Sequence, residues 1–299
     1  MTRTAGTPHP DPLPQGERGK ILLPLPLRER AGVRGASGIT RRACLLLAAM
    51  PPLLVAAPAR AKTPLAAVPI SRLDTPWWRE RHAEKLAEIK RRPIDLVFLG
   101  DSITQDYETT GPAPWRNMRP VWQRFYGDRN AVNLGFSGDA TSHLLWRIEH
   151  GEIDGIAPKV AVILIGANNL GRLHWSADDD VAGIEAVVAE TGRRLPRTKI
   201  MLLGILPSER DEWATRTTLE VNRALAARYG RGAVPGVTFL DVGGVFMRDG
   251  VLDRSLFLDP LLQPPQPPLH PTTEGQTRMA VAMEPTLAAL MGDHNHAAP

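Results

Sequence analysis

Four residues suited to acyl transfer stand out in this sequence, three after short apolar segments and one near the carboxyl terminus. They are Ser102, Gly138, Asn168 and His270. A serine hydroxyl that gives its proton to a histidine can attack an ester carbonyl. Backbone N–H groups and an amide side chain can stabilise the oxyanion that forms. Each residue also has a structural explanation, namely a helix cap, a tight turn, an Asx-turn and a polar loop.

The segments around these residues have the pattern of a buried parallel sheet. Continuous apolar runs suit strands covered on both faces, and they occur at 94–99, 131–134, 160–165, 200–205 and 237–240. Amphipathic, helix-like stretches lie between and around them, at 77–91, 142–150, 177–194, 217–229 and 273–291. We predict one α/β domain over residues 62–299, a flavodoxin-like three-layer α/β/α sandwich around a five-stranded parallel sheet with right-handed crossovers.

Ligands of such sheets bind beyond the carboxyl ends of the strands. The candidate residues should therefore share one pocket at that edge. The sequence blocks that carry them read GDSIT at 100–104, NLGFSGD at 133–139, GANN at 166–169 and LHPT at 269–272. In this order they resemble the SGNH/GDSL hydrolase superfamily. The nearer likeness is to the platelet-activating-factor acetylhydrolase catalytic-subunit branch, in the stretch 133–171, and the resemblance spans about 97–275.

The resemblance implies a serine esterase in which Ser102 is the nucleophile, Gly138 and Asn168 complete the oxyanion hole and His270 is the base. The chemistry of the residues agrees with these roles. Ser102 would lie where a strand turns into a helix, beside free N–H groups and positive potential. Gly138 has no Cβ to keep a substrate from its backbone.

The expected reaction is hydrolysis of a carboxylic ester through an acyl-enzyme, which needs no metal or organic cofactor. A short acyl group such as acetyl is expected, on a small molecule or a carbohydrate. The likeness to a dimeric enzyme branch also raises the expectation of a homodimer. A metal site is not predicted, because His143 and His150 have no evident third ligand and His294 and His296 fall in what reads as a frayed tail.

The pattern breaks at the acid of the triad. The superfamily carries an aspartate three residues before the histidine, where this chain has Pro267, and the preceding acid is Asp259, across a proline-rich loop. Three readings stay open: Asp259 folds back to His270, a backbone carbonyl orients the imidazole in a Ser-His dyad, or the acid is lost and activity is low. We place the dyad ahead of Asp259, which implies that Asp259→Ala lowers ester hydrolysis less than about tenfold.

Residues 1–61 are predicted to lie outside this domain. Residues 1–39 are rich in Pro, Gly and Arg and lack apolar periodicity, so we interpret them as disordered or as a mis-assigned translation start. Residues 40–61 combine a basic start, a short apolar run and an A-x-A site, the pattern of a signal peptide. We therefore expect a periplasmic or secreted protein, and Arg41-Arg42 is compatible with either general or twin-arginine export.

The composition excludes other classes of protein. Of 36 basic and 32 acidic residues, nine basic and three acidic residues lie in 1–61, so the remainder holds 27 against 29, a net charge of −2. That balance gives no reason to expect nucleic acid. No apolar run reaches the ~18 residues of a membrane span. One cysteine excludes a disulfide scaffold and a thiolate metal site.

Two other functions compete with the esterase. A catalytically weak or inactive SGNH-fold protein that binds carbohydrate or acts as a scaffold is supported only by Pro267. A flavodoxin-like nucleotide binder is disfavoured, because the first strand ends in Gly-Asp-Ser and no G-x-G-x-x-G or phosphate-cradling loop follows it.

Overall fold

Five parallel strands form the central sheet in the order β2-β1-β3-β4-β5. The computed structural model describes residues 62–111 and 117–297, so the predicted extension (1–39) and signal peptide (40–61) lie outside the described residues. Each predicted apolar run overlaps one strand: β1 Leu96–Gly100, β2 Ala131–Gly135, β3 Val160–Leu164, β4 Lys199–Leu203 and β5 Val237–Leu240. The order is that of flavodoxin-like sheets, which confirms the predicted fold class.

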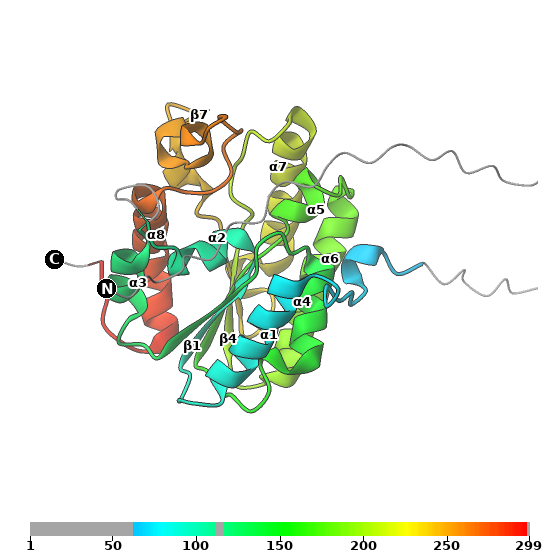
Figure 1. Ribbon diagram of the computed structural model, residues 1–299, viewed down its shortest axis with the longest axis vertical. Coiled ribbons are helices and arrows are strands. Elements are labelled where there is room, and N and C mark those ends of the chain that lie inside the picture. The colour runs from blue at the N-terminus through cyan, green and yellow to red at the C-terminus, as the bar shows by residue number, and fades with distance from the viewer. Residues whose placement is uncertain (1–61, 112–116, 298–299) are drawn as a thin grey trace, which may run out of the picture. The chain divides into compact units, whose positions relative to one another are not determined.

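The sheet is buried on both faces because the side chains of alternate residues in each strand pack into two separate hydrophobic cores. In β1, Val97 and Leu99 join one core, and Leu96 and Phe98 join the other. The first core is covered by α1 (Pro76–Ile89), α4 (Thr141–Arg147), α6 (Ala177–Arg194) and α7 (Glu212–Tyr229). The second is covered by α3 (Arg119–Tyr126) and α8 (Thr273–Met291). Figure 1 shows these two groups of helices on opposite sides of the strands. Each fully buried aliphatic side chain contributes about 1.5–3 kcal/mol to this arrangement.

The helices agree with the sequence pattern where a cap marks their start. Helices α6 and α8 have the predicted bounds, and Ser176 and Thr272 cap them by accepting the N–H groups of Asp179 and Gly275. Helix α7 begins at Glu212 rather than at residue 217, because the carboxylate of Asp211 accepts the Ala214 N–H at 2.7 Å.

The sequence analysis did not predict three short helices, because helices of eight residues or fewer are too short to show a helical period. These helices are α2 (Ser102–Gln105), α3 and α5 (Ala167–Gly171). Helix α4 ends at Arg147 instead of residue 150, and a π-type turn, Ile148–Glu152, follows. Gly151 in that turn has a φ of 98°, which no α-helix contains.

The strand order determines where the site forms. The chain runs from β1 to β2 on one side and then crosses to β3 on the other side of β1. This reversal opens a crevice at the carboxyl ends of the strands. Ser102 follows β1 and Asn168 follows β3, so the switch point brings both to one edge. A small hairpin, β6 (Met247–Arg248) with β7 (Val251–Leu252), lies between β5 and α8 in the chain.

The histidines near the carboxyl terminus are held in place, which corrects the expectation of a frayed tail. Nδ1 of His296 lies 3.0 Å from Glu284 in α8, and its Nε2 lies 3.0 Å from Asp128. Ligand atoms of Asp128, His294 and His296 come within 4.8 Å of one another. Both ring nitrogens of His296 already have carboxylate partners, so ion pairing accounts for the cluster. Among the described helices, none is long and apolar enough to cross a membrane.

Candidate active site

Three side chains from distant parts of the sequence meet beyond the carboxyl end of β1. Oγ of Ser102 lies 2.9 Å from Nε2 of His270. Nδ1 of the same ring lies 2.7 Å from Oδ1 of Asp259. The three groups are connected in the order of a Ser-His-Asp triad. The preference for a backbone carbonyl as the partner of the imidazole is therefore corrected, since a carboxylate occupies that position.

The proline-rich loop returns Asp259 to His270 because the loop closes at its base. The N–H of Leu258 donates to the carbonyl of His270 at 2.7 Å. Phe257 and Pro271 form an antiparallel bridge beside it. The two arms of the loop thus run side by side, like the arms of a hairpin, and the acid lies opposite the base.

The second carboxylate oxygen of Asp259 secures the returning arm. Oδ2 accepts the N–H groups of Leu269 at 2.8 Å and of His270 at 2.5 Å. The acid stands eleven positions before the histidine instead of three. The sequence alone does not identify this acid, because the family spacing points to Pro267 and no local sequence pattern predicts a loop that folds back.

The strand-to-helix turn leaves the backbone N–H of Ser102 without a partner among the described residues. Asp101 caps α2, since its Oδ1 accepts the N–H of Ile103 at 3.0 Å. No acceptor among the described residues takes the N–H of Ser102 or that of Gly138. Two donors at this edge of the sheet are therefore free for a ligand.

The remaining predicted residues lie next to the serine turn. Gly138 has a φ of 75°, a conformation that favours glycine. The Nδ2 group of Asn168 donates to the carbonyl of Asp139 at 3.1 Å and to Oδ2 of Asp101 at 3.4 Å. The amide therefore connects the residue after Gly138 with the residue before Ser102. All five predicted site residues are brought to one region.

The charges around the imidazole favour its work as a base. Burial lowers the pKa of His270, but the hydrogen bond that its ring donates to Asp259 and the charges of Asp106, Asp259 and Asp101 outweigh burial and hold the pKa above its usual value. Burial raises the pKa of Asp259, and the hydrogen bonds and charge of His270 more than reverse this, so the carboxyl stays ionised. Burial raises the pKa of Asp101 to about 7.

A buried ion network underlies the turn after β2, and sequence reasoning missed it. Arg147 is fully buried, donates from Nε to Oδ2 of Asp139 at 2.8 Å and contacts the carboxylate of Glu152. Its other N–H groups donate to the carbonyls of Leu134 and Gly100, each at 3.0 Å. One guanidinium thus ties the ends of β1 and β2 to the turn that carries the predicted oxyanion donor.

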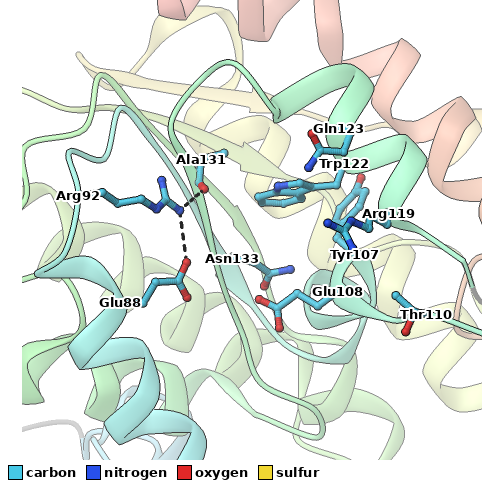
Figure 2. Close-up of a pocket in the computed structure, with 10 residues that line it drawn as sticks. All are labelled: Glu88, Arg92, Tyr107, Glu108, Thr110, Arg119, Trp122, Gln123, Ala131 and Asn133. Atoms are coloured by element: carbon cyan, nitrogen blue, oxygen red, sulfur yellow. Dashed lines mark hydrogen bonds and ion pairs between the residues drawn. The ribbon is translucent and has the colours of Figure 1, made fainter. Parts of the chain in front are cut away.

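A hollow of about 290 Å³ lies elsewhere, along the outer edge of β2 (Figure 2). At one side of it the guanidinium of Arg92 donates to the carbonyl of Ala131 in this edge strand at 2.7 Å and to Glu88 at 3.3 Å. A charged group over the edge of a sheet blunts pairing with other chains. None of the predicted site residues lines this hollow. Its lining consists of Glu88, Arg92, Tyr107, Glu108, Thr110, Arg119, Trp122, Gln123, Ala131 and Asn133.

Comparisons with known proteins agree with this geometry. The sequence profile of the GDSL-like Lipase/Acylhydrolase family matches residues 98–278. The chain is 32% identical over 180 residues to platelet-activating factor acetylhydrolase IB subunit alpha2 of Gallus gallus, covering 58% of this chain and 71% of that protein. It is 29% identical over 226 residues to the alpha1 subunit of Homo sapiens, covering 74% and 88%.

A solved structure shares the fold. The crystal structure of a GDSL-like lipase from Bacteroides thetaiotaomicron superposes with a TM-score of 0.54 at 17% identity, covering 70% of this chain and 97% of that one. At this level of identity the likeness concerns the arrangement of strands and helices. It agrees with the five-stranded parallel sheet described above.

Proposed function

This chain belongs to the GDSL-like lipase/acylhydrolase family, and on that premise we propose that it hydrolyses carboxylic esters through an acyl-enzyme on Ser102. The observation that carries the proposal is the contact of 2.9 Å between Ser102 Oγ and His270 Nε2. Asp259 supports the imidazole from its other side at 2.7 Å. A nucleophile, a base and an orienting acid in this sequence are what serine-based acyl transfer requires.

In the proposed reaction, Nε2 of neutral His270 takes the hydroxyl proton as Oγ of Ser102 bonds to the ester carbonyl carbon. The carbonyl oxygen becomes an oxyanion, which the N–H groups of Ser102, Gly138 and Asn168 stabilise. Collapse of this intermediate expels the alkoxide, which receives the proton from His270. Water then attacks the acyl carbon while His270 takes a proton from it; the bond to Oγ breaks, Ser102 recovers its proton from His270, and the carboxylic acid leaves.

To stabilise the oxyanion, the side-chain amide of Asn168 must give up one of its two hydrogen-bond acceptors. Its contact with Oδ2 of Asp101, at 3.4 Å, is the longer of its two hydrogen bonds. A hydrogen bond of that length is weak. We infer that the substrate oxygen replaces this contact, while the bond to the carbonyl of Asp139 keeps the amide oriented.

A short acyl group, acetyl above all, is the proposed donor. The relatives in the comparison are named acetylhydrolases, and we extend that preference to this chain. The alcohol part is proposed to be a small molecule or a carbohydrate. Chain-length dependence tests this: kcat/KM for 4-nitrophenyl acetate should exceed that for the butyrate and octanoate esters, and a rising series would overturn the acetyl preference.

The test of the function itself is a chromogenic acetyl-ester assay with wild-type protein and Ser102→Ala. Wild type should release 4-nitrophenol well above the uncatalysed rate, and Ser102→Ala should fall to a residual level. Ser255→Ala is the matched control, because its hydroxyl lies on an exposed turn and bonds to Asp253. Equal activity in wild type and Ser102→Ala contradicts the proposal.

We further propose export to the periplasm or the medium, on the sequence pattern of residues 40–61 alone. Sequencing the amino terminus of protein recovered from the periplasm should find a start near Lys62, and an intact terminus in the cytoplasmic fraction opposes the idea. A homodimer is proposed on family likeness, and sedimentation at several concentrations decides between dimer and monomer.

The alternative of an inactive carbohydrate-binding or scaffold protein no longer has an observation in its favour. It rested on Pro267 standing where the family has its acid. The carboxylate of Asp259 contacts the imidazole instead, so the triad has an acid and the esterase is the function that we favour.

A further inference from the structure

Two guanidinium groups flank the predicted oxyanion residues without a carboxylate partner. Arg172 follows α5, the short helix that carries Asn168, and Arg210 lies in the segment before α7. Among the residues that the structure describes, no carboxylate lies within 4.0 Å of either group. Other arginines nearby do have such partners: Arg72 and Arg147 both pair with Asp139. The contrast singles out Arg172 and Arg210.

Arg172 lies directly against the predicted oxyanion donor. A methyl group added to Gly138 would come within 2.5 Å of Nη1 of Arg172. The backbone N–H of Arg172 donates to the carbonyl of Asn168 at 3.1 Å. The side chain therefore stands at the rim of the site, close to where a bound ester would meet Gly138.

Arg210 contacts the backbone of α5. Its Nη1 donates to the carbonyl of Ala167 at 3.1 Å, and a methyl group on Gly171 would come within 2.5 Å of the same nitrogen. Because glycine leaves this space open, the guanidinium packs against the helix backbone. Both arginines thus lie next to the short helix that presents Asn168.

Each guanidinium also lines a cavity that includes at least one predicted site residue in its wall. One cavity, of about 190 Å³, is bounded by Arg172, Gly138, Asn168 and His143. The other, of about 370 Å³, is bounded by Arg210 and Asp259 together with the proline-rich loop. A substrate group that extends from the reacting ester into either cavity would meet a positive charge.

The acids near these arginines are already engaged. Asp139 is fully buried and paired with Arg72 and Arg147. Asp259 holds His270, and Asp211 caps α7. Within the described residues Arg172 and Arg210 therefore have no ion-pair partner of their own, although the charges of Asp101, Asp211 and Asp259 act on Arg210 from farther away.

The two arginines act on neighbouring titratable groups and on each other. Burial lowers the pKa of His143 to about 4, the charge of Asp139 opposes this shift, and the charges of Arg72, Arg147 and Arg172 add to it. Burial also lowers the pKa of Arg210; Asp101, Asp211 and Asp259 oppose that shift, and Arg172 adds to it as a like charge. A bound anion would relieve this repulsion, and the planar fork of a guanidinium suits the oxygens of carboxylate and phosphate.

We propose that Arg172, assisted by Arg210, binds a carboxylate or phosphate group on the alcohol part of the ester, so that the enzyme prefers anionic acetyl esters. The charge belongs to the alcohol part because an acetyl group carries none. The inference rests on the proposed esterase function and specifies its substrate class.

The test compares matched esters. 4-Acetoxybenzoate is set against its neutral methyl ester, and 4-acetoxyphenyl phosphate against its neutral dimethyl ester, each corrected for spontaneous hydrolysis. For wild type, kcat/KM of at least one anionic ester should exceed that of its neutral partner by about tenfold or more. The two pairs distinguish a carboxylate site from a phosphate site. A ratio near one for both pairs overturns the proposal.

Substitution assigns the preference to its residue. Arg172→Met should lower the anionic-to-neutral ratio by about tenfold, mainly through KM, and Arg172→Lys should restore part of it. Arg223→Met, an exposed arginine on α7, is the control whose ratio stays that of wild type. An unchanged ratio in Arg172→Met contradicts the assignment.

Salt gives a readout that needs no variant. Raising NaCl from about 20 mM to about 500 mM should lower the wild-type ratio, because exposed charges are screened. A salt-independent ratio opposes the proposal even where Arg172→Met fails to fold. Hydrolysis of neither member of any pair would instead count against the esterase function, so the two failures are distinguishable.

Discussion

Asp259 and His270 face each other at 2.7 Å although they stand eleven positions apart in the sequence. The two oxygens of the carboxylate have separate tasks. Oδ1 meets the imidazole, and Oδ2 holds the backbone N–H groups of Leu269 and His270. One side chain therefore orients the base and also fixes the end of the loop that carries it.

Replacing this acid should slow the reaction severely. For Asp259→Asn we expect kcat with 4-nitrophenyl acetate to fall by about 10²–10⁴, because a neutral amide neither selects the required tautomer nor stabilises the imidazolium. This supersedes the smaller loss that a Ser-His dyad implies. Asp249→Asn, on an exposed turn, serves as the control, and a loss below tenfold in Asp259→Asn would restore the dyad reading.

The acidic limb of the pH–rate profile should report His270. The reaction needs the neutral imidazole, and the pKa of His270 is raised above its usual value, so kcat/KM should fall as the pH drops through a midpoint above about 6.5. Asp259→Asn removes a main cause of the raised pKa of His270, while burial of the ring still lowers that pKa. We therefore expect the acidic limb of the Asp259→Asn profile to move to lower pH, and a shift to higher pH would contradict this account of the electrostatics.

Removing the amide of Asn168 should affect catalysis more than binding. Asn168→Ala deletes a proposed oxyanion donor, and loss of one such donor lowers kcat by about 10²–10³. Steady-state kinetics on an acetyl ester separate kcat from KM. Asn130→Ala, in an exposed turn where the amide bonds to Asp95, is the control. A change confined to KM in Asn168→Ala would argue for a binding role instead.

The buried network below the turn should be essential for stability. Arg147→Met leaves Glu152 buried without its cation and leaves Asp139 with Arg72 alone, and breaking a buried pair lowers the free energy of unfolding by about 3–5 kcal/mol. Urea unfolding measures this. Arg278→Met removes an exposed pair with Glu274 and should leave the midpoint nearly unchanged. Similar midpoints for both variants would show that the network contributes little.

The sequence predicts this fold well where a periodic signal is strong. Strands buried on both faces are continuous apolar runs, so all five strands were predicted, and capped helices such as α6 and α8 had the right bounds. Short helices leave no period to detect. Helix α7 began earlier than predicted, although Asp211 at its cap was a readable signal.

The site was predictable as far as its residues follow strands. Ser102, Gly138 and Asn168 come after strand ends and therefore converge. Asp259 does not, because its position depends on the hydrogen bond from Leu258 to His270, a tertiary contact with no sequence period. Arg172 and Arg210 could not be predicted as a binding site for the same reason, since only the structure shows which arginines have no carboxylate partner.

The most direct test of the central claim is covalent labelling of Ser102. Mass spectrometry of the intact protein after reaction with a fluorophosphonate should find one adduct per chain. Peptide mapping should place that adduct on Ser102, and Ser102→Ala should acquire none. An adduct on another residue, or full esterase activity with Ser102 unlabelled, would contradict the account.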